Sequence, residues 1–96
     1  MNRIKLGIIG TNFVSDWLAE AAALTPDIDL TSVLSRSQEN GAAFAERHGI
    51  PHHFENIDRF LKSGLDAVYI AVPNSLHCEY TLRALCAGLH VLCEKP

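Results

Sequence analysis

Three residues near the start of the chain form a pattern that could bind an anion. An apolar segment, residues 4–9, ends at Gly10, and Asn12 and Ser15 follow where the dinucleotide-binding pattern Gly-x-Gly-x-x-Gly has its second and third glycines. A glycine-rich turn between a strand and a helix can hold a pyrophosphate, because backbone N–H groups approach it closely and the helix contributes its positive dipole end. Asparagine takes a positive φ more readily than other non-glycine residues, so Asn12 is compatible with such a turn. The alternative interpretation is a tight turn without a ligand.

A second polar group, Ser35-Arg36-Ser37, follows roughly 20 residues later, where an NAD site usually carries an acidic residue for the ribose hydroxyls. A guanidinium flanked by hydroxyls can instead bind a 2′-phosphate through charge-assisted hydrogen bonds. Arg36 could also stack on the adenine ring. The sequence therefore predicts NADP as the cofactor, with NAD as a possibility. The alternative is a solvated arginine beside Ser37, which would then cap a helix.

Hydrophobic periodicity and turn residues divide the chain into alternating strands and helices. Strands are expected at residues 4–9, 30–34, 52–54, 66–72 and 90–93, with helices between them; Ser37, Asn56 and Ser75 are the expected N-caps of the last three helices, and Gly49 is a left-handed C-cap. Such alternation predicts an α/β fold, a doubly wound parallel sheet of Rossmann type with five strands in the order 3-2-1-4-5. A six-stranded version would continue further, so we expect the fold to be incomplete.

The first helix, expected at residues 13–24, carries two residues that bear on the site. Trp17 lies on the apolar stripe of the helix, so we expect it in the core rather than as a stacking platform. Asp16 lies in the first turn, where it can interact with the helix dipole, although its charge would oppose a nearby pyrophosphate.

Composition narrows the class of protein. The 96 residues are about two-thirds of an average domain of roughly 150 residues. A hydrophobic content of 48% with 20% charged residues is typical of a globular chain. The net charge of −3 argues against a general nucleic-acid binder, and the longest apolar run is too short to span a membrane. Together with an odd number of cysteines and no secretory signal, these features predict a cytoplasmic domain.

Five histidines and three cysteines raise the question of a metal site. No pair among them has the spacing of ligands on one helix or in a Cys-x-x-Cys turn, so we expect none. Cys78, Cys86 and Cys93 are interpreted as small buried hydrophobic residues.

Four segments in their order and spacing resemble the Gfo/Idh/MocA oxidoreductases. They are Gly7-Ile8-Ile9-Gly10, Ser35-Arg36, Ala71-Val72-Pro73-Asn74-Ser75-Leu76-His77, and the closing segment from Ala87 to Glu94-Lys95-Pro96. The closing Gly-x-His-Val-x-x-Glu-Lys-Pro pattern is the most specific of the four. The resemblance covers essentially the whole chain, as the N-terminal nucleotide-binding part of a two-domain enzyme. Such an enzyme moves a hydride between a nicotinamide cofactor and a hydroxyl carbon, often of a sugar or cyclitol.

The resemblance implies roles for particular residues. Those implied to contact the cofactor are Gly10, Thr11, Asn12, Phe13, Ser35, Arg36, Ser37, Ala71, Val72, Pro73, Asn74, His77 and Glu94. The first four would hold the pyrophosphate, the serines and arginine the adenosine ribose and its phosphate, and Glu94 the nicotinamide ribose. Lys95 would be catalytic, meeting the substrate hydroxyl as a cation, or as a base if burial lowered its pKa. In the 96-residue chain alone, the alternative is a frayed terminal lysine.

Residues 1–96 are thus expected to form a dinucleotide-binding domain, with the substrate-binding domain absent from this chain. The chain alone should bind cofactor without turning over a small-molecule substrate. Two alternatives stay open: a non-catalytic nucleotide-binding sensor or regulatory module, and an assembly domain with an empty pocket. The unpaired edge of the last strand also predicts a homo-oligomer.

Overall fold

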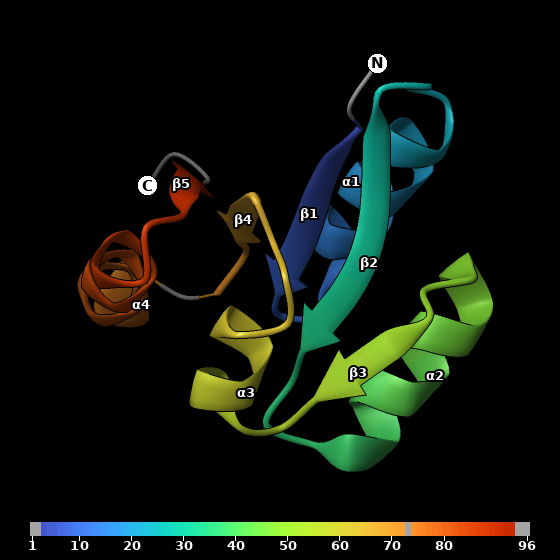
Figure 1. Ribbon diagram of the computed structural model, residues 1–96. Helices are drawn as coiled ribbons and strands as arrows, with labels where there is room; N and C mark the ends of the chain where they lie inside the picture. Colours follow the sequence, from blue (N-terminus) through green and yellow to red (C-terminus); the bar gives the residue numbers. More distant parts are fainter. Residues whose placement is uncertain (1–2, 73, 94–96) are drawn as a thin grey trace.

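The computed structural model describes residues 3–72 and 74–93, in which strands and helices alternate along the chain (Figure 1). The elements are β1 (Ile4–Ile9), α1 (Phe13–Ala23), β2 (Ile28–Leu34), α2 (Gln38–His48), β3 (His52–Phe54), α3 (Ile57–Leu61), β4 (Ala67–Ile70), α4 (Asn74–Cys86) and β5 (His90–Cys93). The strands pair in parallel in the order β3-β2-β1-β4-β5. The predicted doubly wound sheet and its strand order are confirmed.

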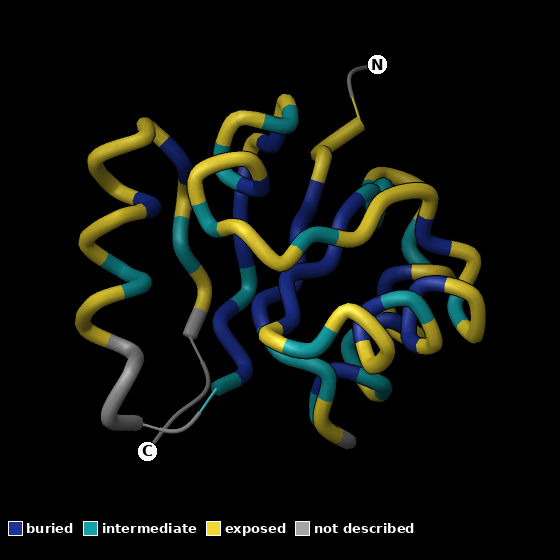
Figure 2. The backbone as a smooth tube through the Cα atoms, turned by 90° about the horizontal axis from the view of Figure 1, so that it is seen from below, coloured by how far each residue is buried: buried dark blue, intermediate teal, exposed yellow. Residues whose placement is uncertain are grey.

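Helices cover the sheet from both sides, and neighbouring residues of one strand therefore serve different cores. Ile8 of β1 packs in a cluster with residues of α1 and α2, whereas Ile9 packs in a second cluster with Phe60 of α3 and Ala84 of α4. The central strands are accordingly buried, whereas the helices carry both buried and exposed residues (Figure 2). This explains the continuous apolar runs, because successive side chains of a strand point to opposite faces.

A glycine in β1 allows α3 to lie close to the sheet. A Cβ on Gly7 would lie 2.6 Å from the ring of Phe60 and 2.7 Å from a methyl group of Leu65. Phe60 is fully buried against the strand, and its ring meets that of Phe54 edge-on at 6.1 Å between centroids. The absent side chain thus makes room for the aromatic ring that anchors α3.

Two predicted boundaries near the end of β4 are wrong. The strand ends at Ile70 rather than Val72, because the Ala71 carbonyl accepts a hydrogen bond from the Asn12 side chain instead of continuing the ladder. Ser75 is not an N-cap, since α4 already begins at Asn74. Several adjacent polar residues can start a helix here, and periodicity does not distinguish between them.

The predicted burial of Trp17, Cys78 and Cys86 is also wrong. Trp17 is 64% exposed, because α1 turns the small residues Ser15, Ala19 and Ala22 toward the sheet. Both cysteines are exposed on α4. The Cys93 side chain lies outside the described part of the structure. Within residues 3–72 and 74–93, no helix is long and apolar enough to cross a membrane.

Candidate functional site

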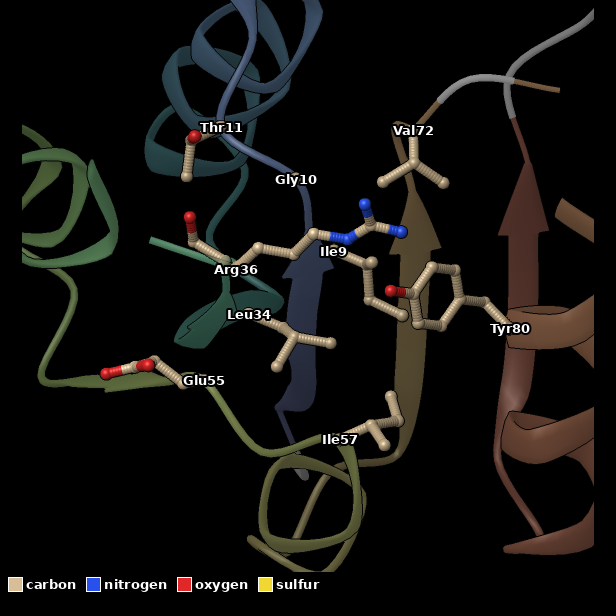
Figure 3. A pocket seen from close by; sticks show the side chains of 10 residues that line it. Ile9, Gly10, Thr11, Leu34, Arg36, Glu55, Ile57, Val72 and Tyr80 are labelled. Carbon is tan, nitrogen blue, oxygen red and sulfur yellow. The ribbon is translucent and has the colours of Figure 1, made fainter. Parts of the chain in front are cut away.

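The carboxyl ends of the strands border a pocket of about 330 Å³ (Figure 3). It is lined by Ile9, Gly10, Thr11, Leu34, Ser35, Arg36, Glu55, Ile57, Val72 and Tyr80. In doubly wound sheets ligands bind at this edge, where the crossovers on the two sides of the first strand diverge. The pocket brings together five of the predicted site residues, Gly10, Thr11, Ser35, Arg36 and Val72.

The remaining predicted residues lie around the pocket or outside the described part of the chain. Asn12 and Ser37 are N-caps, and Ala71 is buried beneath the turn that follows β1. Phe13 begins α1, while Asn74 and His77 belong to the first turn of α4. Pro73, Glu94 and Lys95 lie outside the described residues.

Gly10 is required by the close approach of the β1–α1 turn to β4. Its φ is 108°, a conformation that side chains rarely adopt. A Cβ would lie 2.5 Å from the Ala71 carbonyl oxygen. The Gly10 N–H donates to the Leu34 carbonyl at 2.9 Å, so the turn is attached to β2 as well.

Asn12 uses both ends of its amide, and it does so with extended backbone rather than positive φ. Its φ and ψ are −83° and −175°, and its Oδ1 accepts from the N–H groups of Val14 at 3.0 Å and Ser15 at 3.1 Å. Its Nδ2 donates to the Ala71 carbonyl at 2.6 Å. Asn12 therefore caps α1 and ties the start of that helix to the end of β4.

This capping limits which backbone groups can bind an anion. The N–H groups of Val14 and Ser15 are occupied by the Asn12 side chain. In the described part of the chain, no group accepts a hydrogen bond from the N–H of Thr11 or Asn12. These two N–H groups lie at the positive end of the α1 dipole, where they can donate to a phosphate.

The charge of Asp16, in the first turn of α1, is balanced from α2. Its Oδ1 accepts hydrogen bonds from His48 Nε2 at 2.6 Å and Arg47 Nη2 at 2.8 Å. The bond from His48 and then that from Arg47 lower the pKa of Asp16 below its ordinary value of 3.8. These contacts join α1 to α2 and reduce the repulsion that a carboxylate would exert on a nearby anion.

Arg36 places an uncompensated positive charge at the mouth of the pocket. Its exposed side chain extends across the pocket from the end of β2 toward Val72 (Figure 3). Among the charged groups that the structure describes, none forms an ion pair with Arg36. The neighbouring serines are engaged locally: Ser35 Oγ accepts from the Ser37 N–H at 3.3 Å, and Ser37 Oγ accepts from the Asn40 N–H at 3.2 Å.

Sequence reasoning missed half of the pocket. Ile9 and Leu34 end β1 and β2, and Glu55 follows β3, so their position at strand ends was a usable signal. Ile57 and Tyr80 come from α3 and α4, and no motif marks them. Across the described ranges, no three His, Cys, Asp or Glu side chains gather where they could hold a metal ion.

A five-stranded parallel sheet with a glycine turn and a pocket at its carboxyl edge defines the Rossmann class of nucleotide-binding folds. The model of the oxidoreductase family with an NAD-binding Rossmann fold matches residues 4–96. The chain belongs to this family, the Gfo/Idh/MocA oxidoreductases.

The relatives include enzymes acting on sugars and cyclitols. Scyllo-inositol 2-dehydrogenase (NADP(+)) of Bacillus subtilis is 46% identical over 94 residues, which are 97% of this chain and 29% of that protein. The 1,5-anhydro-D-fructose reductase of Ensifer adhaerens is 40% identical, over 100% of this chain and 28% of the relative. The chain thus spans less than a third of the length of these curated relatives.

A solved structure supports the same assignment. The scyllo-inositol dehydrogenase of Lactobacillus casei, determined with bound NAD(H) and scyllo-inositol, superposes with a TM-score of 0.90 at 29% identity, covering 99% of this chain and 28% of that one.

We predict that Asn12→Ala destabilises the protein more than Asn56→Ala, since Asn56 caps α3 without a second long-range bond. Loss of the cap costs about 0.5–2 kcal/mol. Leaving the buried Ala71 carbonyl without its donor adds about 1–3 kcal/mol. Urea unfolding of both variants measures the difference, and an equal or smaller loss for Asn12→Ala would contradict the bridging role.

The Asp16 contacts predict a pH-dependent contribution to stability. Because the folded pKa lies below 3.8, the contribution is complete above that value and is lost as the pH falls through the folded pKa. Asp16→Asn should therefore lower the free energy of unfolding at pH 7 by up to about 1 kcal/mol. Thermal unfolding should show the gap to the parent closing below pH 3.8. Asp27→Asn, an exposed change in the α1–β2 connection, is the control; a gap independent of pH would refute the prediction.

Proposed function

We propose that this chain binds NADP, with the adenosine end in the pocket at the carboxyl edge of the sheet and the pyrophosphate beside Gly10. The observation that carries the proposal is Arg36, whose guanidinium extends over the pocket without an ion pair to any described residue. An unpaired guanidinium at the end of the second strand suits a 2′-phosphate, which a carboxylate there would repel.

The β1–α1 turn supports the proposed position of the pyrophosphate beside Gly10. The N–H groups of Thr11 and Asn12 are available donors, and the α1 dipole favours negative charge at the same place. Gly10 keeps the approach free of a side chain. Ser35, Ser37, Ala71, Val72, Pro73, Asn74, His77, Phe13 and Glu94 complete the proposed cofactor contacts.

Relatives with different cofactors make the preference for NADP a matter for experiment. The Bacillus subtilis relative is named an NADP(+) enzyme, whereas the Lactobacillus casei structure holds NAD(H). The positive charge of Arg36 after β2, where an NAD site usually carries a carboxylate, is the feature of this chain that favours NADP.

For the whole protein we propose oxidoreduction at a hydroxyl carbon of a sugar, cyclitol or similar substrate. The names of the relatives, among them scyllo-inositol 2-dehydrogenase and 1,5-anhydro-D-fructose reductase, support this substrate class. When bound, the nicotinamide supplies the site that accepts or donates the hydride. In this proposal residues 1–96 are the dinucleotide-binding domain, a second domain binds the substrate, and Lys95 contacts the substrate hydroxyl and holds or removes its proton.

Titration with NADPH and NADH tests the cofactor assignment. The parent should bind NADPH more tightly, and Arg36→Ala should weaken NADPH binding by about tenfold or more while changing NADH binding less. Arg59→Ala, an exposed change on α3 outside the pocket, should leave both affinities unchanged. Equal affinity of the parent for the two cofactors would refute the preference, and absence of binding would refute the function.

We also propose that the chain associates with a second copy through the β5 side of the sheet. In the described sheet β5 pairs only with β4, so its other edge offers unpaired backbone groups. Leu92 of β5 is 54% exposed and Ile4 is 48% exposed, and both line a groove of about 630 Å³. Pairing of two such edges across a two-fold axis would satisfy these backbone groups and bring Leu92 to the interface.

Sedimentation equilibrium tests this association. The parent should form dimers at high concentration, and Leu92→Lys should shift the equilibrium toward monomer. Leu85→Lys is the matched control, since Leu85 is 55% exposed but lies on α4, away from the edge. A parent that stays monomeric, or equal effects of the two substitutions, would refute the proposed interface.

A further inference from the structure

One wall of the pocket is formed by Tyr80, which belongs to none of the sequence motifs that indicate the family. Tyr80 lies on α4, is half-buried, and packs against the core cluster that includes Ile9 and Ile70. Its ring reaches from the helix into the pocket with the hydroxyl directed toward the interior (Figure 3). Part of the side chain therefore packs on the core while its hydroxyl end faces the pocket.

The pocket around this ring has aliphatic side chains in its wall and a charged side chain at its mouth. Ile9, Leu34, Ile57 and Val72 supply aliphatic surface, while Arg36 extends its guanidinium from the opposite strand end toward Val72 (Figure 3). A phosphate or a bare ribose gains little from aliphatic surface. A flat heteroaromatic ring gains binding energy from all three kinds of side chain, because it can lie on the aliphatic groups, stack under the guanidinium and meet the edge or face of the phenol.

We propose that Tyr80 is a purine-recognition residue, which contacts the adenine ring with its own ring and donates a hydrogen bond from its hydroxyl to a ring nitrogen of the base. The inference rests on the proposed cofactor binding and adds to it a specificity-determining residue on α4. In this arrangement Arg36 covers the base from one side and Tyr80 bounds it from the other, so the two residues select for an aromatic base together with its phosphorylated ribose.

Binding of adenosine 2′,5′-bisphosphate and NADPH to substituted chains tests the role. Tyr80→Phe keeps the ring and its packing but removes the hydroxyl, so it should lower the affinity for both ligands by roughly three- to tenfold. Tyr80→Leu removes the aromatic ring as well and should lower both affinities by roughly tenfold or more. Tyr69→Phe is the matched control at the other tyrosine of the chain, outside the pocket, and should leave both affinities unchanged.

A spectroscopic measurement separates contact from a merely structural effect. In the Tyr69→Phe chain Tyr80 is the single tyrosine, so nuclear Overhauser effects from its ring protons to adenine H2 or H8 of bound adenosine 2′,5′-bisphosphate can be assigned without ambiguity. We expect these effects. If the parent binds the ligand but Tyr80→Leu binds it equally well, or if the base protons show effects only from other residues, the role of Tyr80 is refuted while cofactor binding stands. If the parent binds neither ligand, the proposed function itself fails.

Discussion

The contact between the β1–α1 turn and the end of β4 is the constraint on which the site depends. A Cβ on Gly10 would lie 2.5 Å from the Ala71 carbonyl oxygen, and the Asn12 amide donates to that same oxygen at 2.6 Å. One buried carbonyl therefore determines both where β1 leaves the sheet and where α1 begins. Because the amide is oriented by this bond, its oxygen faces the N–H groups of Val14 and Ser15, and the same side chain joins the start of α1 to the sheet.

The same contact has a chemical consequence, because it removes two of the helix N–H groups from competition for an anion. An uncapped α-helix presents its first N–H groups to any ligand along its axis. Here the Asn12 side chain occupies two of them, those of Val14 and Ser15, while no described group accepts from the N–H groups of Thr11 and Asn12. A phosphate bound by these last two groups would lie beside Gly10. Asp16 is meanwhile held by His48 and Arg47, so its charge is directed toward α2.

The parts of the fold that follow from local chemistry could be predicted from the sequence. The strand order follows from the alternation of strands and helices, and Ser37 and Gly49 cap α2 as expected, with Gly49 at a φ of 67°. The orientation of α1 could not be predicted in this way. Apolarity alone selects the stripe that contains Trp17, whereas the buried face of α1 carries small side chains, Ser15 and Ala19 among them. In this helix the fit of small side chains in a close-packed interior, more than their hydrophobicity, determines which face is buried.

In the candidate site, too, some residues could be predicted from the local sequence, whereas others are placed there by tertiary packing. Arg36 could be predicted because it lies two residues after the last residue of a strand whose end must lie at the switch point of the sheet. Ile57 depends on a longer chain of causes: Gly7 has no side chain, so Phe60 lies on β1, and this anchors α3 where Ile57 can reach the pocket. Tyr80 likewise depends on how α4 packs over β4. The positions of Ile57 and Tyr80 in the pocket are therefore determined by core packing, and substitutions in the core can change ligand recognition without touching a motif residue.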